Sequence, residues 1–258
     1  MNRQLPLLFA LAVAAACRSA APVRTSEAQP TPAPSPAAAA QQPSPAPAPV
    51  RLPDSIRWVR DSAEYRALFL QVYREATEHV EREAVRRAPG TWAVVLDADE
   101  TVIDNSVYEV ERIEGNLPFN APAWHEWTTR RAAVPLPGAA AFLARVHALG
   151  GRIAIVTNRT ESECTDTEAV FRAHELPFDV MLCMPEEGPR DKNPRFEAVA
   201  RGATPAGLPP LEIVAFVGDN IFDFPGLSQA IVKQGDEAFA EFGVRFFVLP
   251  NPMYGSWN

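Results

Sequence analysis

Four aspartates that follow two apolar segments are the side chains best suited to chemistry in this 258-residue chain. Asp97 and Asp99 come after Trp92–Leu96, and Asp219 and Asp223 come after Ile213–Val217. In an extended chain, Asp97 and Asp99 point to the same side. If the two segments are neighbouring strands, the four carboxylates share one small pocket, where they must hold protons or surround a cation. Because all these ligand atoms are oxygens, the pattern favours a hard ion such as Mg²⁺.

A second group of residues is suited to binding an anion. Thr157, Asn158 and Arg159 follow an apolar segment and precede a helical one, so a hydroxyl, backbone N–H groups and a helix N-terminus meet there. Lys192 is one of only two lysines in the chain, which indicates a need for a compact ammonium group. Together with Mg²⁺, Lys192 and Thr157 would bind a phosphoryl group, and Asp97 would supply the nucleophile.

Each of these residues also has an ordinary explanation when it is taken alone. The pattern Asp-x-Asp is common in loops and binds metals in sugar transferases. Lys192 alone is most simply a surface lysine, and Thr157 alone is a helix cap. Their order along the chain, each at the end of an apolar segment, favours a single site.

Alternating apolar and helical segments predict how these residues are positioned. Helical periodicity spans residues 54–85 and stops at Pro89-Gly90. Strands are expected at 92–96, 152–156, 179–183, 212–217 and 244–249, and helices at 139–149, 161–175 and 194–201. This alternation predicts an α/β fold with a parallel sheet covered on both faces. In such a sheet, ligands bind beyond the carboxyl ends of the strands.

The first 50 residues differ in composition from the rest. They hold 10 of the 26 prolines and none of the 13 glycines. Residues 1–17 read as a secretion signal and resemble a bacterial lipoprotein signal, so Cys17 is the expected lipidation site and membrane anchor. Residues 18–50 predict a disordered Pro/Ala-rich tether. We expect an outer-membrane lipoprotein of the cell envelope, facing the periplasm or the exterior; the alternative is a soluble periplasmic or secreted protein.

Residues 51–258 form an acidic body that is large enough to bury a core. The first 50 residues carry three arginines and one glutamate, so the formal charge of −8 for the chain becomes −10 for residues 51–258. Proteins that bind nucleic-acid polymers need a basic face, and this balance argues against such a partner. A small phosphate ester needs only a local cationic spot, so the charge does not exclude it.

These motifs resemble those of the haloacid dehalogenase superfamily. The resemblance rests on Asp97-x-Asp99-x-Thr101, Thr157, Lys192 and Gly218-Asp219-x3-Asp223. Within the superfamily, Val95–Tyr108 and Val217–Phe224 are similar to the bipartite signature of the class C acid phosphatases, which are bacterial lipoprotein 5′-nucleotidases and nonspecific acid phosphatases. The similarity also includes Trp58, Ser62–Tyr65, Trp124, Trp127 and Leu249–Gly255, and covers nearly all of residues 55–257. Ala98 and Ile221 depart from the usual pattern.

The resemblance implies a Rossmannoid parallel sheet with helices on both faces and a small, mainly helical cap, formed by about 55–88 and 105–137. It implies an acid phosphatase that hydrolyses small phosphomonoesters, 5′-nucleotides among them, through an aspartyl-phosphate. Asp97 is then the nucleophile, and Asp99 is the acid that later activates water. The implied metal residues are Asp97, Asp219, Asp99 through its backbone carbonyl, and Asp223 close to the metal. The implied phosphate-binding residues are Thr157, Asn158 and Lys192.

The cap is expected to select the substrate. Tyr108, Trp124, Trp127 and Tyr254 are candidates to stack on a base or another aromatic leaving group. Alternatively, Trp124 and Trp127 anchor the insert to the core. Cys164 and Cys183 form a disulfide in an oxidising periplasm or stay as two buried thiols.

Two other functions use the same residues differently. A dehalogenase of the same superfamily would act on carbon without a metal, which Asp99, Asp219 and Asp223 argue against. A tethered binding or storage protein would need no catalysis, and the intact Asp97 argues against it.

Overall fold

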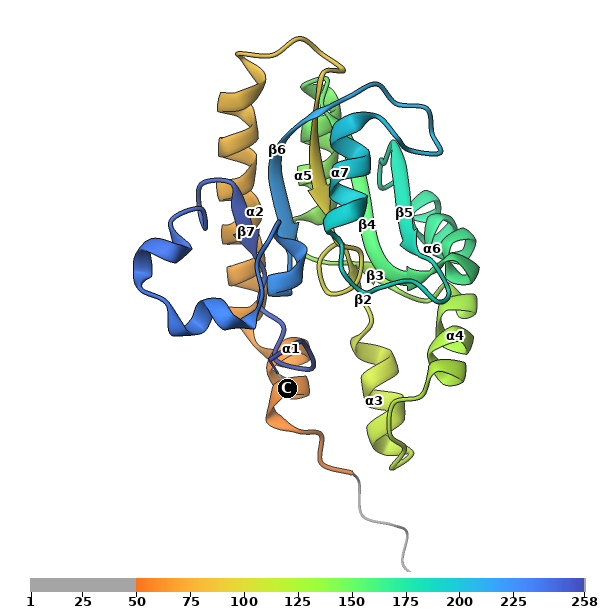
Figure 1. Cartoon of the computed structure of the whole chain (residues 1–258). Coiled ribbons are helices and arrows are strands. Elements are labelled where there is room, and N and C mark those ends of the chain that lie inside the picture. The colour runs from red at the N-terminus through yellow and green to blue at the C-terminus, as the bar shows by residue number, and fades with distance from the viewer. Residues whose placement is uncertain (1–49, 258) are drawn as a thin grey trace, which may run out of the picture. The chain divides into compact units, whose positions relative to one another are not determined.

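The structure is a computed structural model and describes residues 50–257 (Figure 1). The predicted signal peptide of residues 1–17, its Cys17 and the tether up to residue 49 lie outside the described residues. Between residues 50 and 257, no helix combines the length and the apolar character needed to cross a membrane.

Five parallel strands form a central sheet in the order β5-β4-β1-β6-β7. The strands are β1 (Trp92–Leu96), β4 (Arg152–Thr160), β5 (Val180–Met184), β6 (Glu212–Gly218) and β7 (Phe246–Val248). The central strand β1 pairs with β4 on one side and β6 on the other. Because all the strands are parallel, their carboxyl ends meet at one edge of the sheet, which confirms the predicted arrangement.

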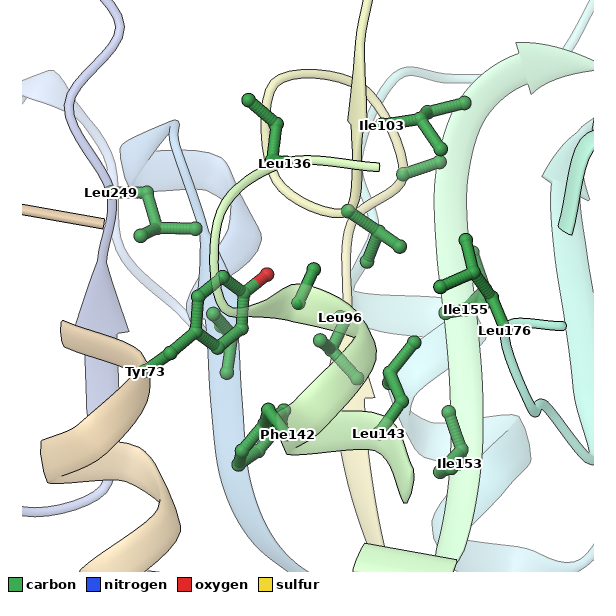
Figure 2. Packing of buried hydrophobic residues seen from close by; sticks show 14 of the residues in the cluster. Tyr73, Leu96, Ile103, Leu136, Phe142, Leu143, Ile153, Ile155, Leu176 and Leu249 are labelled. Atoms are coloured by element: carbon green, nitrogen blue, oxygen red, sulfur yellow. The ribbon is translucent and has the colours of Figure 1, made fainter. Parts of the chain in front are cut away.

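Helices cover both faces of this sheet, as predicted. On one face lie α2 (Ala63–Ala84), α5 (Ala139–Ala148) and α6 (Glu161–Ala173), and on the other lies α7 (Asn193–Arg201). The two-residue period of β1 explains this division: Val94 and Leu96 join the first core, whereas Ala93 and Val95 join the second. Figure 2 shows Leu96 of the first core among Tyr73, Phe142 and Leu143.

The predicted helix over residues 54–85 is divided at Ser62. The side chain of Ser62 accepts a hydrogen bond from the backbone N–H of Tyr65 (3.1 Å), so Ser62 ends α1 (Asp54–Asp61) and caps α2. Helix α2 buries Phe69 and Tyr73 against α5, β6 and β7. The prediction that residues 55–88 belong to the cap is therefore wrong for α2, because its apolar stripe covers the sheet. Helix α1 contacts the insert instead.

The insert between β1 and α5 is small and mainly helical, as expected. It contains β2 (Ile103–Asp104), α3 (Ser106–Glu114), α4 (Ala121–Arg130) and β3 (Val134–Pro135). Strands β2 and β3 pair antiparallel at its base, and α4 packs against α6. In Figure 1, α3 and α4 lie beyond the carboxyl edge of the sheet. We use the term cap for α3 and α4.

Three short 3₁₀ helices and a disulfide complete the fold. The 3₁₀ helices η1 (Ile221–Asp223), η2 (Gln229–Lys233) and η3 (Asp236–Phe239) follow β6. Cys164 of α6 is bonded to Cys183 of β5, with the two Cα atoms 6.0 Å apart. Of the two states that the sequence left open for this pair, the structure has the disulfide.

Candidate active site

The residues predicted to do chemistry come from four places along the carboxyl edge of the sheet. Asp97 follows β1 directly, and its backbone N–H donates to the carbonyl oxygen of Val217 (3.1 Å). This bond keeps the ends of β1 and β6 together, so Asp97 lies beside Asp219. Thr157 lies in β4, and Lys192 is the residue before α7.

Lys192 is buried between two carboxylates. Its Nζ lies 2.7 Å from Oδ1 of Asp97 and 2.6 Å from Oδ1 of Asp223, and only 3% of its side chain is exposed. Burial opposes the charge of this ammonium, but Asp223 and Asp97 outweigh burial and raise the pKa of Lys192. Lys192 is therefore a buried cation of the site and not the surface lysine that it would most simply be when taken alone.

Three carboxylates lie close enough together to hold one metal ion. Asp97, Asp219 and Asp223 each offer an oxygen, and these three oxygens lie within 4.8 Å of one another. Burial is the main cause that raises the pKa of Asp97 to about 7; Lys192 opposes this shift, and neighbouring Asp223 and Asp99 contribute to it. Burial and the same crowding raise the pKa of Asp219 well above its ordinary value. Crowded, partly buried oxygen ligands of this kind fit a hard divalent cation.

Two further residues hold the Asp219 carboxylate. The hydroxyl of Thr101 donates to Oδ1 (3.2 Å), and Nδ2 of Asn251 donates to Oδ2 (2.8 Å). Thr101 is itself fixed, because the hydroxyl of Tyr73 in α2 donates to its carbonyl oxygen (2.7 Å). The metal-binding face therefore depends on α2 and on the segment after β7 as well as on the strand ends.

The side chain of Asp99 stands apart from this group of three carboxylates. Arg159 donates to its Oδ1 from Nε (3.0 Å) and Nη2 (2.8 Å), and Asn105 Nδ2 donates to the same oxygen (2.8 Å). Of the four carboxylates expected to share one pocket, Asp97, Asp219 and Asp223 therefore form the close group. Asp99 is near enough to Asp97 to raise its pKa, but a buried guanidinium neutralises the Asp99 side chain separately. The role implied for its backbone carbonyl stays a prediction.

The loop between Asp99 and Asn105 has a strained turn at Glu100. This residue has a φ of 49°, in the left-handed region, and its side chain is buried. Its Oε1 accepts the backbone N–H of Asn105 (2.8 Å), and burial raises its pKa well above the ordinary value. The hydrogen bond from Asn105 to Glu100 thus fixes the conformation of the loop that carries Asp99.

The predicted anion site is only partly present in the expected form. Thr157 is fully buried in β4, and Arg195 donates to its carbonyl oxygen and to Oδ1 of Asn158 (2.6 Å). Strand β4 continues to Thr160, beyond its expected end at residue 156, and α6 begins at Glu161, as expected. The backbone N–H groups of Thr160 and Ser162 already donate to Glu163 and Glu186. The expected contribution of the helix N-terminus is therefore wrong, because protein carboxylates satisfy those groups.

Two of the four predicted stacking residues are unavailable to a substrate. Tyr108 and Trp127 are each 2% exposed and pack against one another, with ring centroids 6.3 Å apart. The stacking prediction is wrong for both residues, since the cap buries them as its own core. Trp124 and Tyr254 are partly exposed and stay candidates. The guanidinium of Arg159 lies over the Trp124 ring, 5.2 Å from its centre.

The sequence assigned no role to several side chains that hold the site residues in place. The most important are Arg159, Asn105, Asn251 and Arg195, each of which bonds a candidate catalytic or binding residue. Arg159 is 2% exposed, and a buried arginine needs a buried anionic partner. Its place directly after Thr157-Asn158 at the end of an apolar strand was the one available signal.

Comparisons with known proteins agree with this geometry. The family model described as "HAD superfamily, subfamily IIIB (Acid phosphatase)" matches residues 25–257. A class C acid phosphatase from Bacillus anthracis has a similar structure, with a TM-score of 0.69 and 27% identity over 79% of this chain and 84% of that chain. The same kind of enzyme from that organism with tungstate bound gives a TM-score of 0.68 and 26% identity over the same shares.

The fold is thus that of a known group of phosphatases, whose superfamily generally uses a divalent metal, and a group of three carboxylates lies at the strand ends of this chain. The chain belongs to subfamily IIIB of the haloacid dehalogenase superfamily, the acid phosphatases, and is a phosphoric monoester hydrolase.

Proposed function

We propose that this protein is a Mg²⁺-dependent phosphatase of the cell envelope that cleaves 5′-nucleotides and other small phosphomonoesters through an aspartyl-phosphate. The observation that carries the proposal is the partly buried group of Asp97, Asp219 and Asp223 with Lys192 inserted between two of its members. A carboxylate can approach a phosphate dianion only where cations offset the repulsion. Lys192 supplies one such charge.

In the first half of the proposed reaction, a carboxylate oxygen of Asp97 attacks phosphorus and the bond to the leaving oxygen breaks. Asp99 gives a proton to that oxygen, and the alcohol departs. Lys192 offsets negative charge on the transferring group, and Thr157 contributes polar contacts. A bound Mg²⁺, held by Asp97, Asp219 and the Asp99 carbonyl with Asp223 close by, would supply electrostatic stabilisation of the phosphoryl oxygens.

In the second half, Asp99 takes a proton from water, whose oxygen attacks phosphorus. The bond between Asp97 and phosphorus breaks, so phosphate leaves and both carboxyl groups return to their starting states. The tungstate complex of the Bacillus anthracis relative supports an oxyanion pocket in this family, because tungstate, like phosphate, is a tetrahedral oxyanion.

Nucleotide preference rests on two partly exposed aromatic residues: Trp124, whose ring the Arg159 guanidinium covers, and Tyr254, three residues after Asn251. Either ring could stack on a base and add roughly 1–3 kcal/mol to binding. The test is phosphate release from nucleoside 5′-monophosphates, sugar phosphates and simple aryl phosphates by the purified protein.

The metal proposal is tested in the same assay. Activity should vanish after exhaustive chelation and return with Mg²⁺, and a panel of other divalent ions ranks the alternatives. Full activity in chelator would contradict the metal proposal and favour a metal-independent reaction of the dehalogenase type.

The proposed location rests on two features of the chain. The lipoprotein-like signal ends at Cys17, and the Cys164–Cys183 disulfide is typical of proteins that fold in an oxidising compartment. We expect full-length protein in the outer-membrane fraction and Cys17→Ser in the soluble fraction. Equal membrane association of both would contradict the lipid anchor.

A further inference from the structure

Asn105 connects the catalytic loop to the cap through three side-chain hydrogen bonds. Its Nδ2 donates to Oδ1 of Asp99 (2.8 Å), and its Oδ1 accepts from Nε1 of Trp127 (2.8 Å) and from Nη2 of Arg159 (3.0 Å). Asn105 is fully buried. Water therefore does not compete for these bonds, and the geometry of the amide is set by protein groups alone.

The chemistry of the partners determines which way the Asn105 amide faces. An indole N–H and a guanidinium can only donate, so Trp127 and Arg159 both require the amide oxygen. The amide NH₂ is then left to face Asp99, whose carboxylate can accept it. Trp127 comes from α4 of the cap, and its ring is buried, so its N–H direction is fixed by packing.

The two oxygens of Asp99 are consequently unequal. Oδ1 accepts from Arg159 Nε and Nη2 and from Asn105, whereas Oδ2 accepts one longer bond, from Arg159 Nε at 3.2 Å. The oxygen with fewer donors is the better carrier of a proton. Asn105 thus directs Oδ2 toward the role of proton donor.

Resting on the function proposed above, we propose that Asn105 and Trp127 are positioning residues for the acid/base Asp99. Trp127 fixes the Asn105 amide, Asn105 engages Oδ1 of Asp99, and Oδ2 is left to protonate the leaving oxygen. The cap thereby acts on the chemical step through a hydrogen-bond chain, although neither residue touches the substrate.

Leaving-group chemistry separates this role from a purely structural one. An alkoxide, such as the 5′-oxygen of a nucleoside, departs only with a proton, whereas p-nitrophenolate departs readily without one. A variant with a poorly placed Asp99 should lose kcat/KM on alkyl phosphates and keep most of it on p-nitrophenyl phosphate, because kcat/KM reports the steps up to departure of the leaving group and not the later attack of water. A variant with a damaged fold should lose both alike.

The experiment compares Trp127→Phe with Trp92→Phe as a matched control. Trp92 is also fully buried, but it lies at the start of β1, and within residues 50–257 its N–H has no partner. Both changes remove a similar side-chain volume, but only Trp127→Phe also removes a hydrogen bond, the one from the indole N–H to Asn105. For Trp127→Phe we expect kcat/KM on adenosine 5′-monophosphate to fall about tenfold, with less than about threefold loss on p-nitrophenyl phosphate. Trp92→Phe should leave the ratio of the two unchanged.

Asn105→Ala supplies a second, independent variant. It should lower the alkyl-to-aryl ratio by roughly tenfold to a hundredfold. Adding Trp127→Phe to it should lower the ratio no further, because the two residues act through one chain. Thermal unfolding of every variant shows which of them are folded, and one folded variant is enough for the test.

Asp99→Asn distinguishes failure of this inference from failure of the proposed mechanism. If Asp99→Asn does not lower the alkyl-to-aryl ratio, the acid role of Asp99 is wrong. If Asp99→Asn does lower this ratio, but Asn105→Ala and Trp127→Phe lower kcat/KM on the alkyl and the aryl phosphate equally or not at all, the positioning inference is wrong.

Discussion

The ammonium of Lys192 lies 2.7 Å from a carboxylate oxygen of Asp97; Asp97 directly follows β1, and Lys192 directly precedes α7. Burial raises the pKa of Asp97 to about 7, and Lys192 is the neighbour that opposes this shift. Lys192 therefore favours the ionised form of Asp97, which a nucleophile requires. It also lies beside the position that the negatively charged phosphoryl group must occupy for attack by Asp97.

Replacing Asp97 by Asn should abolish turnover and preserve the fold. The amide is a poor nucleophile, so we expect kcat to fall by about a thousandfold or more. The fold should persist because Asp223 still pairs with Lys192. Phosphate release measures the loss of turnover, and the thermal unfolding midpoint measures whether the fold is preserved. Activity within a few-fold of wild type would eliminate Asp97 as the nucleophile.

Replacing Lys192 by Met keeps much of the side-chain volume and removes its charge. Asp97 and Asp223 then face each other without a cation, and charge on the transferring group is no longer offset. We expect kcat/KM to fall about 10²–10³-fold, equivalent to roughly 3–4 kcal/mol. Lys233→Met, at the other lysine of the chain, is the control because that side chain is exposed on η2. Equal effects of the two changes would contradict the assigned role.

Adding a methyl group at Gly218 should disturb the site without replacing a charged residue. A Cβ at this position would overlap Cβ and Oδ2 of Asp223, which also accepts the backbone N–H of Asn220 (2.8 Å). Gly218→Ala should therefore displace Asp223 and lower kcat/KM by about tenfold or more, with weaker metal binding. Gly207→Ala is the comparison, since open space surrounds Gly207 despite its φ of +65°. Full activity of Gly218→Ala would show that Asp223 is dispensable.

The positions of these residues were predictable to different degrees. Asp97, Thr157 and Asp219 directly follow or end apolar runs, and a parallel sheet brings such positions to one edge. Arg159 and Asn105 were not predictable as partners of Asp99, because a hydrogen bond between distant segments leaves no periodic trace in a sequence.

Other differences have equally local causes. Two tryptophans three residues apart fit both an exposed face that stacks on a substrate and the buried core of a cap. Only the packing in the structure shows that Trp127 belongs to the core of the cap. The break at Ser62 lacks the Gly or Pro that usually ends a helix. Its signal was the serine itself, a preferred N-cap residue, followed by Glu64 in the first turn.

The crowded carboxylates should make the metal-free protein less stable as pH rises. The pKa of Asp97 is raised from 3.8 to about 7, so its stabilising contribution is complete below the unfolded value and is lost as pH rises through the folded value. Asp219 and Glu100 shift in the same direction. The raised pKa of Lys192 lies above this range, so its contribution is constant there.

We therefore expect chelated protein to unfold at a temperature lower by about 4 °C or more at about pH 7.5 than at about pH 5. Added divalent metal should restore stability more at the higher pH, because it binds the ionised carboxylates. Asp97→Asn should reduce the slope. An unfolding midpoint that rises with pH in the chelated wild type would contradict the prediction.

Removing the disulfide should lower stability and leave the chemistry intact. The bond joins α6 to β5 across a sequence separation of 19 residues, and opening a loop of this size costs about 3 kcal/mol in the chain-entropy model. Denaturant unfolding of the Cys164→Ser/Cys183→Ser double variant gives this difference. Neither cysteine bonds a catalytic candidate, so kcat should stay within about twofold at temperatures where the variant is folded. Unchanged unfolding in the double variant would contradict the prediction.

The hydrogen bond from Trp127 to Asn105 has a consequence for how this enzyme can diversify. A cap inserted between a strand and the helix that follows it can be exchanged as a module, since a new cap brings new substrate contacts while the strand ends stay unchanged. Here, however, a grafted cap that lacks an indole N–H at this place would also release the amide beside Asp99. Chimeras that acquire a new specificity should therefore first lose rate on substrates with poor leaving groups, and restoring the tryptophan should recover it.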